Sequence, residues 1–205
     1  MSSLLADERT RFVCAQRMET GTITRLRSYP VIGQIPSQAT IWEAALATSA
    51  ATGFFKPAKI GDCMYGDGGL GANNPVQSVE NEARRLWSGT NGLFESQVKC
   101  FLSLGTGDRG INPITDRAWN FFTKSLTRVA TDTRAPGEEV AARWRDLPGR
   151  PYVRFNVQQG LDVVELADYD KGGHMEAVTS DYLDGEDTSP RVVSCVEILR
   201  TKECR

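Results

Sequence analysis

The sequence contains a single histidine, His174, among 205 residues. A site built from several histidines is therefore excluded, and any Ser–His–Asp triad would depend on this one residue. The charged side chains are 24 basic and 26 acidic, so the basic excess of a protein that binds nucleic acid is also missing. We therefore expect no nucleic-acid partner.

Cysteines are few, and no two of them form a Cys-x-x-Cys pair. The five residues are Cys14, Cys63, Cys100, Cys195 and Cys204. This spacing argues against a disulfide framework or a zinc site and predicts free thiols in a reducing compartment. The sequence also lacks an apolar run of the roughly 18 residues that a membrane span needs, and its N-terminus lacks the apolar core of a signal peptide. We expect a cytoplasmic protein without metal or cofactor, making at most peripheral contact with a membrane.

Strand and helix patterns alternate along the chain. Short strands are predicted at 11–15, 23–29, 98–104 and 152–157. Helices are predicted from the capping box Thr40–Glu43 to about Ala51, and at 76–87, 119–129, 138–147, 175–183 and 190–200, the last with Ser189 as N-cap. This alternation predicts an α/β fold with a mostly helical C-terminal part.

A loop at 65–75 concentrates glycine and asparagine around one carboxylate, Asp67. Its glycines permit positive φ angles and let a backbone or substrate approach closely. Asn74 and Pro75 suit the start of the helix that follows. Two interpretations remain open at this point: a tight turn whose aspartate bonds its own backbone, or a turn that presents Asp67 for chemistry.

Four blocks of residues bear on this choice. In chain order they are Ala47-Thr48-Ser49-Ala50-Ala51 with Lys56-Pro57, Asp67-Gly68-Gly69 with Ala72-Asn73-Asn74-Pro75, Leu102 to Gly107, and Tyr152 to Val157 with Gly160-Leu161. Together they resemble the later part of the catalytic domain of patatin-like phospholipases, and the last block is similar to fungal members. The resemblance implies part of a three-layer α/β domain at 10–110 and a mostly helical extension of it at 111–205.

The resemblance also implies a mechanism. Patatin-like enzymes hydrolyse acyl esters of lipids with a Ser–Asp dyad, through an acyl-serine intermediate and without a cofactor. Carried over by motif position, Asp67 is the proton acceptor, and Gly68 and Gly69 form the turn that presents it. A dyad needs no histidine, so we expect His174 to have a structural role.

The nucleophile does not fit the pattern. No serine in the sequence lies in a Gly-x-Ser-x-Gly elbow: Phe101 replaces the first glycine before Ser103, and alanines occupy both glycine positions around Ser49. We therefore expect the chain to lack the front of its catalytic domain and to be inactive alone. The alternative is a non-catalytic remnant that binds a lipid or a protein.

Other patterns favour structural roles. Residues 105–110 fit Gly-x-Gly-x-x-Gly after a predicted strand, but no helix begins at once, so we expect a turn and not a dinucleotide site. Trp119, Phe121 and Phe122 are expected in the core. Arg84 and Arg85 are expected on a solvated helix face, balanced by acidic neighbours.

Overall fold

The computed structural model describes residues 10–87, 94–108, 133–149, 152–164 and 168–201. Within them the chain forms two compact units that divide after Ser78, inside one helix. The predictions of a helix at 119–129 and of a core cluster at Trp119, Phe121 and Phe122 lie outside the described residues, as does Gly110 of the glycine motif.

The first unit is built on a four-stranded sheet. Its strands are β1 (Phe12–Arg17), β2 (Ile23–Arg27), β3 (Ala58–Ile60) and β4 (Cys63–Asp67). They lie in the order β2-β1-β4-β3, and every neighbouring pair is antiparallel. The strands predicted on either side of Gly21 are thereby confirmed. Residues 65–67, expected in a loop, instead belong to β4, because β1 and β3 pair with it from both sides.

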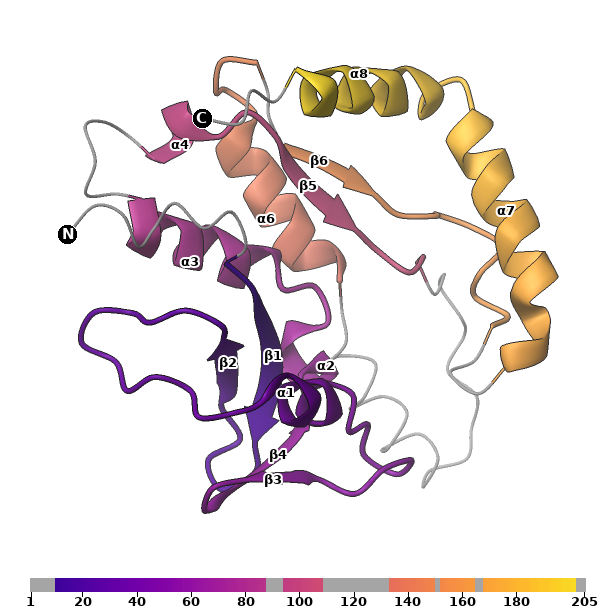
Figure 1. Ribbon diagram of the computed structural model, residues 1–205. Coiled ribbons are helices and arrows are strands. Elements are labelled where there is room, and N and C mark those ends of the chain that lie inside the picture. The colour runs from indigo at the N-terminus through magenta and orange to yellow at the C-terminus, as the bar shows by residue number, and fades with distance from the viewer. Residues whose placement is uncertain (1–9, 88–93, 109–132, 150–151, 165–167, 202–205) are drawn as a thin grey trace. The chain divides into compact units, whose positions relative to one another are not determined.

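Helix α1 (Ile41–Thr48) packs on this sheet, and Figure 1 shows it lying against β1 and β4. The predicted capping box is confirmed: the Glu43 backbone N–H donates to Thr40 Oγ1, and the Thr40 N–H donates to the Glu43 carboxylate. The helix ends at Thr48, three residues before the predicted end. Ala47 packs with Ala15, Leu26 and Tyr65 in a small buried core.

Short helix α2 (Gly69–Ala72) follows β4 directly, and α3 (Val76–Trp87) comes next. The Val76 N–H donates to Asn74 Oδ1 at 3.4 Å, so Asn74 supports the start of α3 as predicted. Gly71, inside α2, has φ +109°, a conformation that L side chains rarely adopt.

The second unit contains a parallel pair of strands, seen side by side in Figure 1. They are β5 (Phe101–Leu104) and β6 (Tyr152–Phe155), and parallel pairing is the form that strand–helix alternation predicts. Its helices are the rest of α3, α4 (Phe94–Gln97), α6 (Arg134–Trp144), the 3-10 helix η1 (Tyr169–Lys171), α7 (Gly172–Asp184) and α8 (Ser189–Arg200). The mixture of sheets and helices confirms the predicted α/β class.

One capping prediction is wrong. Ser189 is the first residue of α8 and not its N-cap; Thr188 occupies the cap, without a side-chain cap hydrogen bond. Thr188 is buried, and the chain enters the helix through backbone bonds from Thr188 and Ser189 to the Gly185 carbonyl. Because the Ser189 N–H is bonded to the Gly185 carbonyl, Ser189 lies in the first turn of α8 and does not precede the helix.

Candidate active site

Asp67 is the last residue of β4, and the backbone around it is fixed on two sides. It lies opposite Ala15 of β1 in the sheet register. Its own N–H donates to the Ala50 carbonyl at 3.0 Å, which ties it to the segment after α1. The side chain is half-buried. A half-buried carboxylate on a fixed backbone can face a reactant without losing its orientation.

Position 68 needs a glycine because there is no room for a Cβ atom, and not because the backbone angle excludes other residues. Its φ of −67° is ordinary, but a Cβ atom there would lie 2.2 Å from the Cys14 carbonyl oxygen and 2.6 Å from the carbonyl carbon. Both atoms are backbone and cannot swing away. The same carbonyl accepts the Thr48 hydroxyl at 2.6 Å, so the end of α1, β1 and the turn after β4 meet at Cys14.

Gly69 closes the turn by donating its N–H to Asp67 Oδ1 at 2.8 Å. Within the described residues this is the hydrogen bond that the carboxylate accepts, and Oδ2 accepts none there. The turn is therefore the self-bonded aspartate turn that the first interpretation expects. It also leaves one carboxylate oxygen with its lone pairs available, which is what a proton acceptor needs.

The two serines weighed as nucleophiles lie in other environments. Ser49 is the C-cap of α1, and its hydroxyl donates to the Ala45 carbonyl at 2.7 Å. Ser103 lies within β5, is buried, and accepts a hydrogen bond from Arg154 at 2.7 Å. Neither occupies the sharp strand-to-helix turn of a nucleophile elbow. The structure therefore provides a candidate base, Asp67, but neither of these two serines lies in the kind of turn that a nucleophile needs.

The glycine turn after β5 is filled by a side chain. Asn156 Oδ1 accepts the Gly107 N–H at 3.0 Å, and Asn156 Nδ2 donates to Asp108 Oδ1 at 2.7 Å. A Cβ at Gly105 would lie 2.0 Å from Asn156 Oδ1. The space that a pyrophosphate would need near these amides therefore holds an amide side chain. In the described part of the motif, the turn closes the strand, as expected.

His174 lies near the start of α7, and its side chain is exposed. Its Nε2 is 2.7 Å from the Gly160 carbonyl oxygen. Gly160 also contacts α7 closely, since a Cβ there would lie 3.0 Å from Val178. His174 thus ties a turn to a helix, in agreement with the structural role expected for it.

The second unit contains a buried carboxylate, Glu80, surrounded by hydrogen-bond donors, and the sequence does not predict this burial. Glu80 of α3 is 3% exposed and accepts hydrogen bonds from Arg84 at 3.0 Å, Arg143 at 2.5 Å and the Trp144 indole at 3.0 Å. Burial opposes ionisation of Glu80, but the bonds from Arg143, Trp144 and Arg84 outweigh it and hold its pKa below the usual value. The expected pairing of Arg84 with Glu80 is present, but the acid is buried and not on a solvated face.

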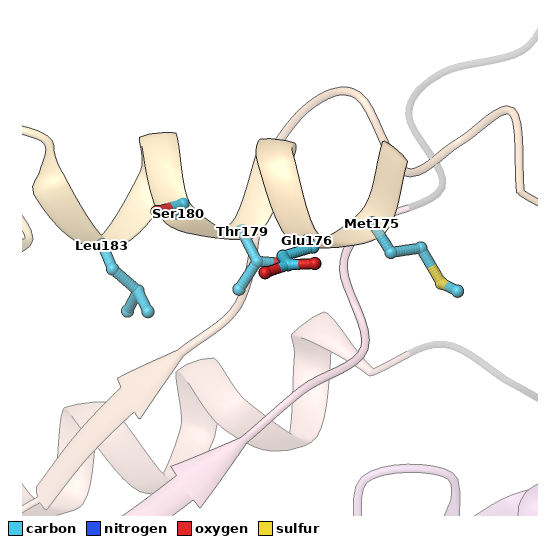
Figure 2. Close-up of a pocket in the computed structure, with 5 residues that line it drawn as sticks. All are labelled: Met175, Glu176, Thr179, Ser180 and Leu183. Atoms are coloured by element: carbon cyan, nitrogen blue, oxygen red, sulfur yellow. The ribbon is translucent and has the colours of Figure 1, made fainter. Parts of the chain in front are cut away.

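A shallow pocket of about 400 Å3 lies along one side of α7 (Figure 2). It is lined by Met175, Glu176, Thr179, Ser180 and Leu183. These residues recur at helical spacing, and the pocket is open to solvent. It belongs to the second unit, whereas Asp67 belongs to the first.

No group of three or more His, Cys, Asp or Glu side chains in the part of the chain that the structure describes could hold a metal ion. No helix in the described ranges is long and apolar enough to cross a membrane. Cys14, Cys63, Cys100 and Cys195 form no disulfide bond among the described residues. Burial, together with the Cys195 side chain, raises the pKa of Cys100.

Comparison with known proteins bears directly on the Asp67 turn. Residues 6–79 match the family model of patatin-like phospholipases. The matched range contains β1 to β4, α1 and the whole turn at 67–69. This part of the chain is therefore similar to patatin-like phospholipases.

Individual relatives agree with the family model. Calcium-independent phospholipase A2-gamma of Oryctolagus cuniculus is 33% identical over 120 residues, which cover 57% of this chain and 14% of the relative. The 85/88 kDa calcium-independent phospholipase A2 of Rattus norvegicus is 28% identical over 149 residues, covering 63% of the chain and 18% of the relative. Phospholipase A I of Arabidopsis thaliana is 26% identical over 132 residues, 63% of the chain and 10% of the relative. The chain thus spans less than a fifth of each of these proteins.

Proposed function

We propose that this chain carries the aspartate part of a Ser–Asp site of a lipid acyl hydrolase, with Asp67 as the general base. The observation that carries the proposal is the turn itself. Gly68 is packed against the Cys14 carbonyl and the Gly69 N–H donates to Asp67 Oδ1, and Oδ2 accepts no hydrogen bond from the described residues. The turn lies inside the range matched by the family model.

The proposed chemistry has two steps. A serine hydroxyl attacks the ester carbonyl of a lipid while Asp67 accepts its proton, and Asp67 returns that proton to the leaving oxygen, so that the alcohol departs as the acyl-serine forms. Asp67, ionised again, accepts a proton from the water that attacks the acyl-serine and passes it to the serine oxygen, which releases the fatty acid and restores the serine hydroxyl. This chain contains no Gly-x-Ser-x-Gly elbow. We propose that it is inactive alone and that the serine is supplied by sequence outside these 205 residues.

The wider assignment rests on the same resemblance. We propose that residues 10–110 are the later portion of the patatin-like domain, of the fungal type, and that 111–205 extend it. We propose a cytoplasmic location on the spacing of the cysteines in the sequence alone.

A chimera tests Asp67 directly. Residues 10–79 replace the matching segment of a catalytically active patatin-like phospholipase, and hydrolysis of a nitrophenyl acyl ester is measured. We expect turnover to persist and Asp67→Asn to lower it by about a thousandfold, the order that loss of a general base costs. Asp62→Asn is the matched control, because Asp62 is exposed in the turn between β3 and β4. Turnover that survives Asp67→Asn would remove Asp67 from the mechanism.

A second candidate is a non-catalytic module that binds a lipid or a protein, favoured by the missing serine elbow. The same chimera separates the two. A folded chimera without turnover, while the parent enzyme is active under the same conditions, favours the module. Turnover by the isolated 205-residue chain that Asp67→Asn abolishes would instead reveal a nucleophile of another pattern.

A further inference from the structure

Two hydroxyl groups are neighbours at the end of α1, and they bond different parts of the chain. Ser49 donates to the Ala45 carbonyl at 2.7 Å, one turn back in the same helix, which is a common local bond of serine and threonine in helices. Thr48 donates to the Cys14 carbonyl of β1 at 2.6 Å, 34 residues away in the sequence. The side chain of Thr48 is half-buried, whereas Ser49 is exposed. The Thr48 hydroxyl therefore joins the helix to the sheet, and the Ser49 hydroxyl bonds within the helix.

The Cys14 carbonyl lies where the pairing of β1 with β4 ends. The last pair in the register of these two strands is Ala15 with Asp67, so Cys14 is the first residue of β1 beyond it. Its carbonyl oxygen is the atom that a Cβ at Gly68 would approach to 2.2 Å. The Thr48 hydroxyl thus holds the carbonyl against which the turn after Asp67 packs.

The same short segment also bonds the backbone of Asp67. Ala50, two residues after Thr48, is buried, and its carbonyl accepts the Asp67 N–H at 3.0 Å. Residues 48–50 therefore bond β1 at Cys14 and β4 at Asp67, on the two sides of the turn. The direction of a general base matters, because a misplacement of about 1 Å can cost about a hundredfold in rate.

We propose that Thr48 is a positioning residue for Asp67. By holding the Cys14 carbonyl, its hydroxyl keeps the turn at 67–69 in the orientation that proton transfer requires. In this role Thr48 neither touches the substrate nor transfers a proton, since it acts through the backbone of β1. The inference rests on the proposed function of Asp67. Loss of the hydroxyl should therefore slow the chemical step and leave substrate binding unchanged.

Amide hydrogen exchange, measured by NMR on the full 205-residue chain, tests these bonds without any need for activity. Thr48→Val removes one hydroxyl and keeps the branched shape, and Ser49→Ala removes a neighbouring hydroxyl whose bond is nearly as short. We expect Thr48→Val to speed exchange of the Asp67 amide about tenfold, because residues 48–50 lose one of their two attachments to the sheet. Thr48→Ser and Ser49→Ala should leave the exchange slow. Equal exchange at Asp67 in Thr48→Val and Ser49→Ala would overturn the inference.

Turnover is measured in the chimera that carries residues 10–79, because this chain contains no Gly-x-Ser-x-Gly elbow. We expect Thr48→Val to lower kcat about tenfold while KM changes less than about twofold, and Thr48→Ser to recover most of kcat. In the Asp67→Asn background Thr48→Val should have no further effect, because the carboxylate that it positions is gone. Ser49→Ala should keep the kcat of the unmodified chimera.

The positioning role and the proposed function fail in different ways. Turnover that survives Asp67→Asn overturns the function, and with it the base that Thr48 would position. Turnover that Asp67→Asn abolishes, with equal kcat in Thr48→Val and Ser49→Ala, overturns the positioning role alone. The same loss from Thr48→Val with and without Asp67→Asn would show a general effect on the fold and would also overturn that role. Circular dichroism of each variant confirms that the measured protein is folded.

Discussion

Glycine-rich turns follow strands β4 and β5, and they differ in how many hydrogen bonds their polar side chains form. After β4, Asp67 Oδ1 is held by the Gly69 N–H, and Oδ2 accepts no hydrogen bond from the described residues. After β5, the Asn156 side chain bonds both the Gly107 backbone and the Asp108 carboxylate. A polar group whose partners are all present stabilises the fold, whereas a fixed carboxylate with spare acceptor capacity can take part in proton transfer.

The two turns also differ in what crowds their glycines. Gly68 faces the carbonyl of a neighbouring strand, but Gly105 faces the ends of the Asn156 and Arg154 side chains. A side chain can rotate away from a new methyl group, and a strand in the middle of a sheet cannot. The turn that carries Asp67 should therefore tolerate change least.

The largest effect is expected for Gly68→Ala. The new Cβ would lie 2.2 Å from the Cys14 carbonyl oxygen, and relief requires β1 to separate from β4. We expect the free energy of unfolding to fall by about 3 kcal/mol or more, measured by urea denaturation. Gly172→Ala is the control, because no atom lies within 4 Å of a Cβ there. A loss below about 1 kcal/mol for Gly68→Ala would show that this turn is not fixed.

Asn156→Ala tests the turn after β5, in which the Asn156 side chain bonds both Gly107 and Asp108. It removes the acceptor of the Gly107 N–H and the donor to Asp108, so both groups lose a partner in a half-buried site. We expect a loss of about 2 kcal/mol in the free energy of unfolding. Asn81→Ala, at an exposed position of α3, should change it little. If the two variants are equally stable, the polar network after β5 does not stabilise the fold.

Glu80 extends the comparison to a carboxylate held by two arginines. Its pKa is lowered in the folded chain from an ordinary value of 4.5, so its contribution is complete above that pH and is lost as the pH falls through the lowered pKa. We expect Glu80→Gln to lower the free energy of unfolding at pH 7 by about 1 kcal/mol, because Arg84 and Arg143 are both partly exposed. The difference should shrink below pH 4.5. A difference that is constant with pH would contradict the ionised pairing.

The sequence predicts local features of this molecule well. The capping box at Thr40 and Glu43 forms within four residues, so no distant contact is needed to recognise it. The glycines of the sequence predict a turn near Asp67, and in the structure the Cys14 carbonyl approaches Gly68 too closely to leave room for a side chain. Its role in catalysis stays a prediction, since it comes from resemblance to a family.

Features that depend on distant partners were missed for physical reasons. Glu80 bonds Arg143, 63 residues away, and nothing in the pattern of α3 marks that carboxylate for burial. Residues 65–67 have turn-forming composition, yet pairing with β1 and β3 makes them a strand. The helix predicted from the capping box is confirmed as α1, but the exposure of Ile41 and Trp42 depends on which face of the helix packs on the sheet.

The smallest effect on stability is expected for Asp67→Asn, and that small effect is itself informative. An asparagine Oδ1 can still accept the Gly69 N–H, so the free energy of unfolding should change by less than about 0.5 kcal/mol. Asp67→Ala removes this acceptor and should cost about 1 kcal/mol. A large loss for Asp67→Asn would mean that the negative charge stabilises the turn, as it does at Glu80. A large loss of stability in Asp67→Asn would thus give the Asp67 charge a structural role. Such a result would count against Asp67 as the general base.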